Sequence, residues 1–266
     1  MMTRCATTTF ILIYALVFFM GCDSEKTGSG NSEKPSTESL SFRVEQGQYE
    51  ATISVFREGS SEPVLVQNVQ EDFRPYLHPI KSPDGQSVLT EYSPGHHKHQ
   101  TGLYWGFTRV NGRDYFHNPE GDYWQKVSAE VLQAEGESVK WQTQYHLLDE
   151  AGEPLLEETQ TWSMQQQGDH YLLDLEWQGK ALQEVTIGEY DYGGLFLRMP
   201  WKEGMPAEVV NAARQRDEKA EGQRAMWLDV GMRVEGRDDF AHIAIFDHPD
   251  NEGFPQTWRV DGQFGV

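Results

Sequence analysis

Residues 139–148 read VKWQTQYHLL, residues 157–164 read EETQTWSM and residues 171–178 read YLLDLEWQ. Apolar and polar side chains alternate in each stretch, which is the pattern of a β-strand with one buried face and one exposed face. Residues 126–133, KVSAEVLQ, alternate in the same way, and Gly136, Gly152 and Gly168 separate consecutive stretches. These four segments predict a meander of antiparallel strands.

Shorter apolar runs continue the pattern on both sides of this meander. They lie at residues 42–44, 49–55, 63–66, 103–107, 185–187, 195–199, 226–230 and 241–246. The dipeptide Asn111-Gly112 is typical of a tight hairpin turn. One segment, Glu208–Gly222, has a helix-like composition with little apolar surface, so it is either a helix or a loop. The sequence predicts an all-β fold, a two-sheet antiparallel sandwich.

The N-terminus has the features of a bacterial lipoprotein signal peptide. Arg4 supplies a positive charge, an apolar run extends from Phe10 to Met20, and Gly21 precedes Cys22. The run is too short to span a bilayer but suits the apolar core of a signal. The alternative is an ordinary secretory signal with a chance cysteine. Lipidation explains why Cys22 would be the single cysteine left after cleavage, so residues 1–22 are predicted to be a lipoprotein signal peptide.

The composition of the remaining chain predicts a linker and one exported domain. Residues 23–41 are polar and rich in Ser, Gly, Glu and Lys, which favours a flexible tether. Residues 42–266 have the length of one β-rich domain. The chain ends on the apolar stretch Asp261–Val266 without a polar tail, so we expect the domain to lack its last strand; an abrupt natural end is the alternative.

The charge of the chain constrains its partners and its location. The formal net charge is −20 and becomes −21 after signal cleavage, because residues 1–22 contain Arg4 and no acid. Such a surface repels phosphate backbones and anionic lipids, so nucleic acid is not expected as a partner. Contact with the membrane is expected only through the lipid on Cys22, on the periplasmic or outer-surface side of the cell envelope.

The densest group of chemically useful side chains is the stretch SPGHHKHQTGLYW at residues 93–105. His97 and His99 are two residues apart and share a side if the stretch is extended. Two such imidazoles can transfer protons, bind a metal or donate hydrogen bonds to sugar hydroxyls. The Pro-Gly pair before them and the aromatic run containing Trp105 after them favour a fixed loop over a solvated one.

Three other segments carry candidate residues. Tyr76 and His78 lie between Pro75 and Pro79, and Arg74 precedes Pro75; these three residues suit either a rigid pocket wall or an edge strand. A second segment contains a Gly-Gly bend. Glu189 and Asp191 precede the bend and share a face if the chain is a strand there, and Arg198 follows it. The last segment is a turn-rich region with polar and aromatic side chains, Asp247, His248, Asn251 and Trp258. Turn formation alone also explains its Asp, Asn, Pro and Gly residues.

Taken together, these motifs resemble one family of exported proteins. The motifs are Arg74-Pro-Tyr-Leu-His-Pro79, the histidine stretch with Val110-Asn-Gly112 after it, Gly193-Gly-Leu-Phe-Leu-Arg-Met199 and Asp247-His-Pro-Asp-Asn251. The chain resembles the uncharacterised family labelled "methane oxygenase PmoA" over residues 42–266. It departs from the usual family pattern at Gly95 and Lys98 and around Asp191. No mature segment has the length of a membrane span, so we do not expect a true methane monooxygenase subunit.

The resemblance implies a sandwich similar to the galactose-mutarotase-like supersandwiches and a role in sugar processing. We therefore expect an exported protein that acts on a sugar or modified glycoside as an epimerase, lyase or hydrolase, with a small carbohydrate ligand and no cofactor. The expected catalytic residues are His97, His99, Glu189 and Asp191. The expected substrate contacts are Arg74, Tyr76, His78, Trp105, Arg198, Asp247, His248, Asn251 and Trp258. The alternatives are a non-catalytic carbohydrate-binding lipoprotein, a metal site at His97 and His99, and a structural envelope protein.

Overall fold

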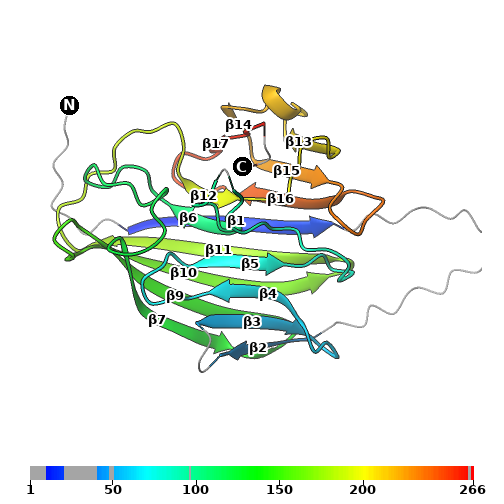
Figure 1. The fold of residues 1–266 in the computed structure, drawn as a ribbon, viewed down its shortest axis with the longest axis horizontal. Helices are drawn as coiled ribbons and strands as arrows, with labels where there is room; N and C mark the ends of the chain where they lie inside the picture. The colour runs from blue at the N-terminus through cyan, green and yellow to red at the C-terminus, as the bar shows by residue number, and fades with distance from the viewer. Residues whose placement is uncertain (1–9, 21–40, 48–50, 96, 263–264) are drawn as a thin grey trace, which may run out of the picture.

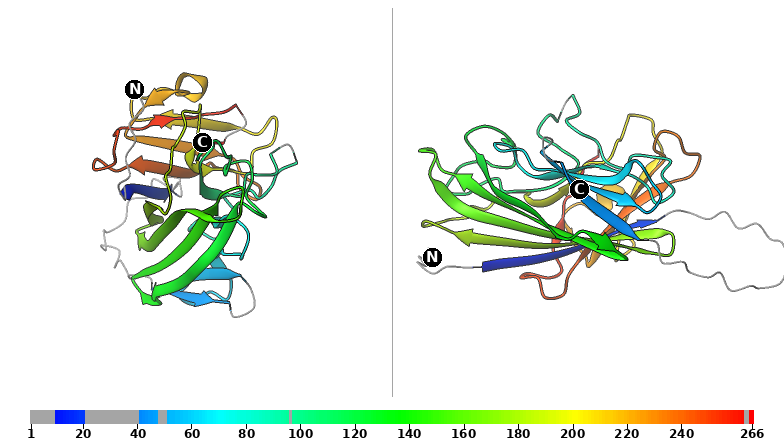
Figure 2. Two further views of the ribbon diagram at one scale, coloured as in Figure 1. Left: turned by 90° about the vertical axis from the view of Figure 1, so that its left-hand side faces the viewer. Right: turned by 90° about the horizontal axis from the view of Figure 1, so that it is seen from below.

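The computed structural model describes residues 10–20, 41–47, 51–95, 97–262 and 265–266. It is all-β, with 51% of the chain in strands, which confirms the fold class expected from the alternating pattern. Two large antiparallel sheets lie face to face and form the layers of a sandwich (Figure 1, Figure 2). Cys22 and the predicted linker at residues 23–41 lie outside the described residues, apart from Ser41.

The larger sheet has eight strands in the order β13-β15-β16-β1-β11-β10-β9-β7. The stretches whose alternation predicted the meander form one half of this sheet, from β11 to the edge strand β7. Their bounds are β7 (Trp124–Gln133), β9 (Ser138–Leu148), β10 (Pro154–Gln167) and β11 (His170–Ala181), and the others are β1 (Phe10–Met20), β13 (Ala207–Asn211), β15 (Trp227–Met232) and β16 (Ala241–Asp247).

The smaller sheet has seven strands in the order β12-β6-β5-β4-β3-β2-β8. Their bounds are β2 (Phe42–Gln46), β3 (Thr52–Arg57), β4 (Pro63–Asn68), β5 (Tyr76–Ile80), β6 (Leu103–Gly106), β8 (Glu135–Gly136) and β12 (Gly194–Leu197). A two-stranded ribbon joins β14 (Gln223–Arg224) to β17 (Thr257–Trp258). The segment Arg74–Pro79 is thus largely part of an inner strand, β5, between β4 and β6.

Tryptophans from the meander fill the space between the two sheets. Trp141, Trp162 and Trp177 are all at most 1% exposed, and Trp141 lies directly opposite Trp162 in the register of β9 and β10. Each indole N–H has a buried acceptor: the side chains of Gln67, Gln160 and Glu158 accept at 2.7, 3.0 and 2.8 Å, respectively. These three rings therefore gain apolar burial without leaving their indole donors unpaired.

The apolar segment Phe10–Met20 forms β1 in the full-length chain. It pairs antiparallel with β11 on one side and β16 on the other (Figure 1). Cleavage before Cys22 would remove β1 and leave β11 and β16 without this neighbour. Signal cleavage remains a prediction for this chain.

Two further points concern helices. In the segment Glu208–Gly222, for which a helix or a loop was predicted, Glu208–Asn211 belong to β13 and the remainder is a loop that contains a short 3₁₀ turn at Asp217–Lys219. In the described part of the chain, no helix has the length and apolar character needed to cross a membrane.

Candidate functional site

Aromatic side chains project from the outward face of the smaller sheet. Tyr76 on β5 lies opposite Tyr104 on β6, and Tyr104 lies opposite Phe196 on β12. All three are at most 6% exposed and pack with Phe73 and Phe116 into a cluster separate from the main core. These aromatic side chains can be buried on the outward face only because other segments lie over them. The covering segments are the chain between β5 and β6 and the chain after β6. The histidine-rich stretch belongs to the first of these two loops.

Arg74 holds the two covering loops in place. Its guanidinium lies 3.6 Å from the centre of the Tyr104 ring and is fully buried. Nη1 donates to the Phe116 carbonyl at 2.8 Å, and Nη2 donates to the His99 carbonyl at 2.6 Å. Burial lowers the pKa of Arg74 to about 10, so the group is still a cation at neutral pH. Arg74, expected as a substrate contact, therefore orients the backbone on which His99 and His117 are placed.

Asp114, His117 and Tyr192 form a chain of hydrogen bonds at the rim of this cluster. His117 Nδ1 lies 2.7 Å from Asp114 Oδ2, and His117 Nε2 lies 3.0 Å from the Tyr192 hydroxyl. Asp114 Oδ1 also accepts from the backbone N–H groups of Phe116 and His117 at 3.0 Å, which fixes the turn. Since an ionised carboxylate only accepts, His117 carries its proton on Nδ1, and Nε2 accepts from Tyr192.

The Tyr192 phenol is kept protonated by its surroundings. Burial, followed by the neighbouring Tyr190 hydroxyl, raises the pKa of Tyr192 to about 12. The side chain is only partly exposed, and its ring packs edge-on against Phe116 and Tyr190. A neutral phenol bonded to an imidazole that is oriented by a carboxylate is an arrangement that can relay a proton.

His99 stands beside this chain as a second imidazole. Its ring centre lies 4.6 Å from that of His117 and 5.9 Å from that of His97. Burial and then the charges of His117 and Arg74 lower the pKa of His99 to about 4. His99 is therefore neutral at pH 7 and can act as a hydrogen-bond donor or acceptor there.

His78 lies farther along β5, next to Tyr92 from the covering loop. Its Nδ1 is 3.0 Å from the Thr90 hydroxyl, and its ring centre is 5.9 Å from that of Tyr92. Burial lowers its pKa. Tyr92 in turn stacks on Tyr76 at 5.5 Å. The structure thus places Tyr76, His78, His97 and His99 in one region.

A cavity of about 530 Å³ opens on the other side of Tyr192. It lies where the edge of the smaller sheet, β6 and β12, faces β16 and the segment containing β17. The aromatic side chains in its wall are Trp105, Phe107, Tyr190, Tyr192, Phe196, Phe246 and Trp258. A volume of this size suits a small molecule, and flat aromatic walls suit the apolar faces of a sugar ring.

The charges around this cavity are predominantly acidic. Asp191, Glu221 and Glu252 line it together with Arg259. Arg259 pairs with Glu221 at 2.9 Å and lies 5.2 Å from the centre of the Tyr192 ring. Tyr192 is the residue that borders both the cavity and the histidine chain, so it joins them into one candidate site.

The residues of the turn-rich segment, which were expected to contact substrate, have different surroundings in the structure. Asp247 and Asn251 line the cavity, but they also bond to each other at 2.7 Å, and Asp247 accepts from the Gln256 backbone at the same distance. Trp258 lines the cavity and donates its indole N–H to the Ala225 carbonyl at 2.6 Å. Two of these residues thus close a turn, while Trp258 remains a wall of the cavity.

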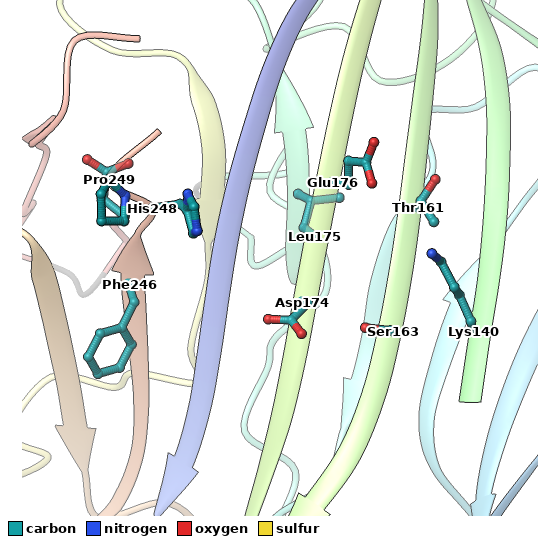
Figure 3. Close-up of a pocket in the computed structure, with 10 residues that line it drawn as sticks. Lys140, Thr161, Ser163, Asp174, Leu175, Glu176, Phe246, His248 and Pro249 are labelled. Carbon is teal, nitrogen blue, oxygen red and sulfur yellow. The ribbon is translucent and has the colours of Figure 1, made fainter. Parts of the chain in front are cut away.

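His248 belongs to a different hollow, on the outward face of the larger sheet. Figure 3 shows β1 running between His248 and Phe246 on one side and Asp174, Leu175 and Glu176 on the other. This hollow measures about 480 Å³, and Phe246 and His248 are the aromatic rings among the described side chains that border it. Glu189 is exposed and is not part of either lining. Neither residue lies with the histidine cluster.

Sequence reasoning missed Asp114 and His117. The spacing Asp114-x-x-His117 directly after the Asn-Gly turn is a usable signal, because an Asp before a turn can bond both backbone and imidazole three residues on. Its partner Tyr192 lies beside the Gly-Gly bend and was not among the expected site residues. The metal alternative has no support from side-chain placement: within the described ranges, no group of three or more His, Cys, Asp or Glu residues is arranged to hold an ion.

Comparison with known proteins gives a family but no activity. No curated protein and no solved structure matches this chain. A model of a family of unknown function, DUF6807, matches residues 62–266, which include every member of the histidine chain and all of the cavity wall. The chain belongs to this family of unknown function, DUF6807.

Proposed function

We propose that the protein is a carbohydrate-active protein of the cell envelope whose site moves a proton to or from a sugar. The observation that carries the proposal is the hydrogen-bonded chain from Asp114 through His117 to Tyr192, which ends at the wall of an aromatic cavity. The resemblance to the exported family labelled "methane oxygenase PmoA", and through it to sugar-processing sandwiches, supports the same reading.

In this mechanism the sugar ring lies in the cavity against Trp105 and Trp258. The Tyr192 oxygen takes a proton from the substrate while its own proton passes to His117 Nε2. Asp114 stabilises the imidazolium that forms, because its carboxylate already accepts from Nδ1. His99, neutral at pH 7, is the nearby group that can hydrogen-bond a sugar hydroxyl.

The chemistry fits the raised pKa of Tyr192. A phenol that titrates near pH 12 is a poor base by itself, and it becomes effective only if its proton leaves as the substrate proton arrives. Proton transfer through Tyr192 therefore requires His117 as the acceptor of the phenol proton. Epimerisation and elimination both begin with such a proton transfer, and general base catalysis of hydrolysis uses the same groups.

The test is hydrogen exchange between sugars and solvent. A panel of monosaccharides and glycosides is incubated with the protein in D₂O, and loss of individual C–H signals and appearance of products are followed by ¹H NMR. We expect Tyr192→Phe and His117→Asn to reduce the rate by about 100-fold or more. Tyr123→Phe, which removes a phenol hydroxyl from a residue outside the cavity wall and the histidine chain, is the matched control and should retain most activity.

The second candidate is a non-catalytic carbohydrate-binding protein. The aromatic wall of the cavity favours binding irrespective of the proton relay. In this case a sugar would bind, Trp258→Ala would weaken binding, and the wild type itself would leave every C–H signal unchanged and form no product. Such a result would remove the enzymatic proposal and leave the binding one.

We further propose that lipidation of Cys22 anchors the protein on the periplasmic or outer-surface side of the envelope. The small residue at position 21 and the apolar run before it support this location.

A further inference from the structure

Arg198 is a buried cation that the relay does not use. It follows β12 directly, and its backbone N–H donates to the Gly102 carbonyl at 2.8 Å. Continuing the register of β5 and β6 by one residue places His78 on the other side of Gly102. Arg198 itself is 0% exposed.

The guanidinium of Arg198 lacks the partners that its burial calls for. Within the part of the chain that the structure describes, none of its three nitrogens makes a hydrogen bond. The nearest acid is Glu91, whose Oε2 lies 3.5 Å from Nε and is itself buried without a hydrogen bond. A guanidinium has five N–H donors, and buried charged groups are normally both paired and hydrogen-bonded. Within the described residues, Arg198 is therefore a buried cation with one close acid and no hydrogen bond to its guanidinium.

Arg198 lies on the same face of the smaller sheet as the aromatic cluster beside the relay. Phe196 pairs with Tyr104 and lies two residues before Arg198, so the three side chains share the outward face. Tyr192, at the end of the proton relay, packs against the cluster that contains Tyr104 and Phe196. A ligand that reaches both would contact Arg198 with one group and Tyr192 with another.

A carboxylate is the acceptor that fits best. Guanidinium and carboxylate are planar and bond through two parallel hydrogen bonds, and the group that approaches Arg198 in this structure, Glu91, is a carboxylate. A dianionic phosphate is less suited, since the chain carries a net charge of −20.

We infer that Arg198 is the carboxylate-binding residue of the site and that the preferred ligands are uronic acids, with Glu91 occupying the position of the ligand carboxylate until a ligand displaces it. The sugar part of this inference rests on the proposed function. Glu91 is suited to displacement because its side chain is 28% exposed and sits in the covering loop, whereas Arg198 is closed to solvent. The carboxylate of a uronic acid would replace a loose contact with a bidentate one.

Calorimetric titration with paired sugars tests the inference. Glucuronate and galacturonate are compared with glucose and galactose, for the wild type and for Arg198→Gln, Glu91→Gln and the control Glu189→Gln, which alters an exposed acid. We expect the wild type to prefer the uronates by about tenfold or more, as for a charge-assisted bidentate contact. Arg198→Gln should abolish the preference, Glu91→Gln should strengthen uronate binding, and Glu189→Gln should change neither.

Acetate separates this inference from the proposed function. If acetate raises the melting temperature of the wild type and of Glu91→Gln, but not that of Arg198→Gln, the anion site stands even when no sugar binds. Equal affinity for uronates and neutral sugars, or no response of any variant to a carboxylate, overturns the inference. Should Arg198→Gln not fold, an unchanged uronate affinity in Glu91→Gln would overturn it as well.

Discussion

The buried acid Glu158 should make the stability of the protein depend on pH, and replacing it by glutamine should remove that dependence. Glu158 is 1% exposed between the two sheets. Its carboxylate accepts from Trp177 Nε1 at 2.8 Å and from Gln160 Nε2 at 2.9 Å. Burial raises the pKa of Glu158 from 4.5 to about 7, against the smaller lowering effect of these two hydrogen bonds and of Arg74.

The sign and size of this pH dependence of the unfolding free energy follow from proton linkage. Between pH 4.5 and 7 the folded protein keeps the proton on Glu158, while the unfolded chain loses it. The free energy of unfolding therefore falls as pH rises through this window. Above pH 7 the contribution of Glu158 no longer changes with pH. A shift of about 2.5 pH units corresponds to roughly 3 kcal/mol.

Glu158→Gln removes this titration but keeps the shape of the side chain. The amide has a single oxygen, so one of the two donors loses its acceptor, at a cost of about 1–3 kcal/mol that does not vary with pH. We expect the variant to be less stable than the wild type at pH 5 and about as stable, or more stable, at pH 8.

Urea unfolding from pH 4.5 to 8, followed by tryptophan fluorescence, measures the effect. The difference in unfolding free energy between wild type and Glu158→Gln should change by about 3 kcal/mol across the range. Glu157→Gln, which alters the neighbouring outward-facing acid, is the control. Parallel pH curves for the wild type and Glu158→Gln would refute the assignment of a raised pKa to this buried acid.

Gly102→Ala should lower the free energy of unfolding by about 3 kcal/mol or more, because φ is +86° and a Cβ would lie 2.3 Å from the Leu77 carbonyl oxygen. Gly112→Ala, at φ +82° in open space, should lower it by only about 1 kcal/mol in the same denaturation assay. Because the pKa of His99 is lowered to about 4, its neutral form stabilises the fold above pH 6.5 and that contribution is lost as pH falls toward 4; His99→Gln should flatten this acid limb. Cys22→Ala should move the expressed protein from the membrane to the soluble fraction, and retention at the membrane would contradict lipidation.

Much of the fold could be predicted from alternation alone. The meander from residue 124 to residue 181 has the predicted strands because every second side chain is apolar and a glycine ends each run. The segment Glu208–Gly222 was harder, since its local composition favours a helix while Val209 and Asn211 are buried in the pairing of β13 with β15. Pairing with a distant strand outweighs local propensity in such a case.

The candidate site was only partly predictable for a related reason. His97 and His99 stood out because histidines are rare and were clustered, and the structure places both in the cluster. Asp114 and His117 did not stand out, because their partner Tyr192 is about 75 residues away in sequence. Glu189 seemed paired with Asp191 by strand alternation, but the segment is not a strand.

The sequence by itself determined the all-β class, the strands of the meander and the histidine-rich loop, because each depends on neighbours within a few residues. Only the tertiary structure decided that Arg74 orients two loops, that Tyr192 joins a histidine chain to an aromatic cavity, and that Arg198 is buried beside Glu91. These contacts depend on which strands pair and which loops cover the outward face of the smaller sheet. That choice is made by packing between distant segments, and no local pattern encodes it.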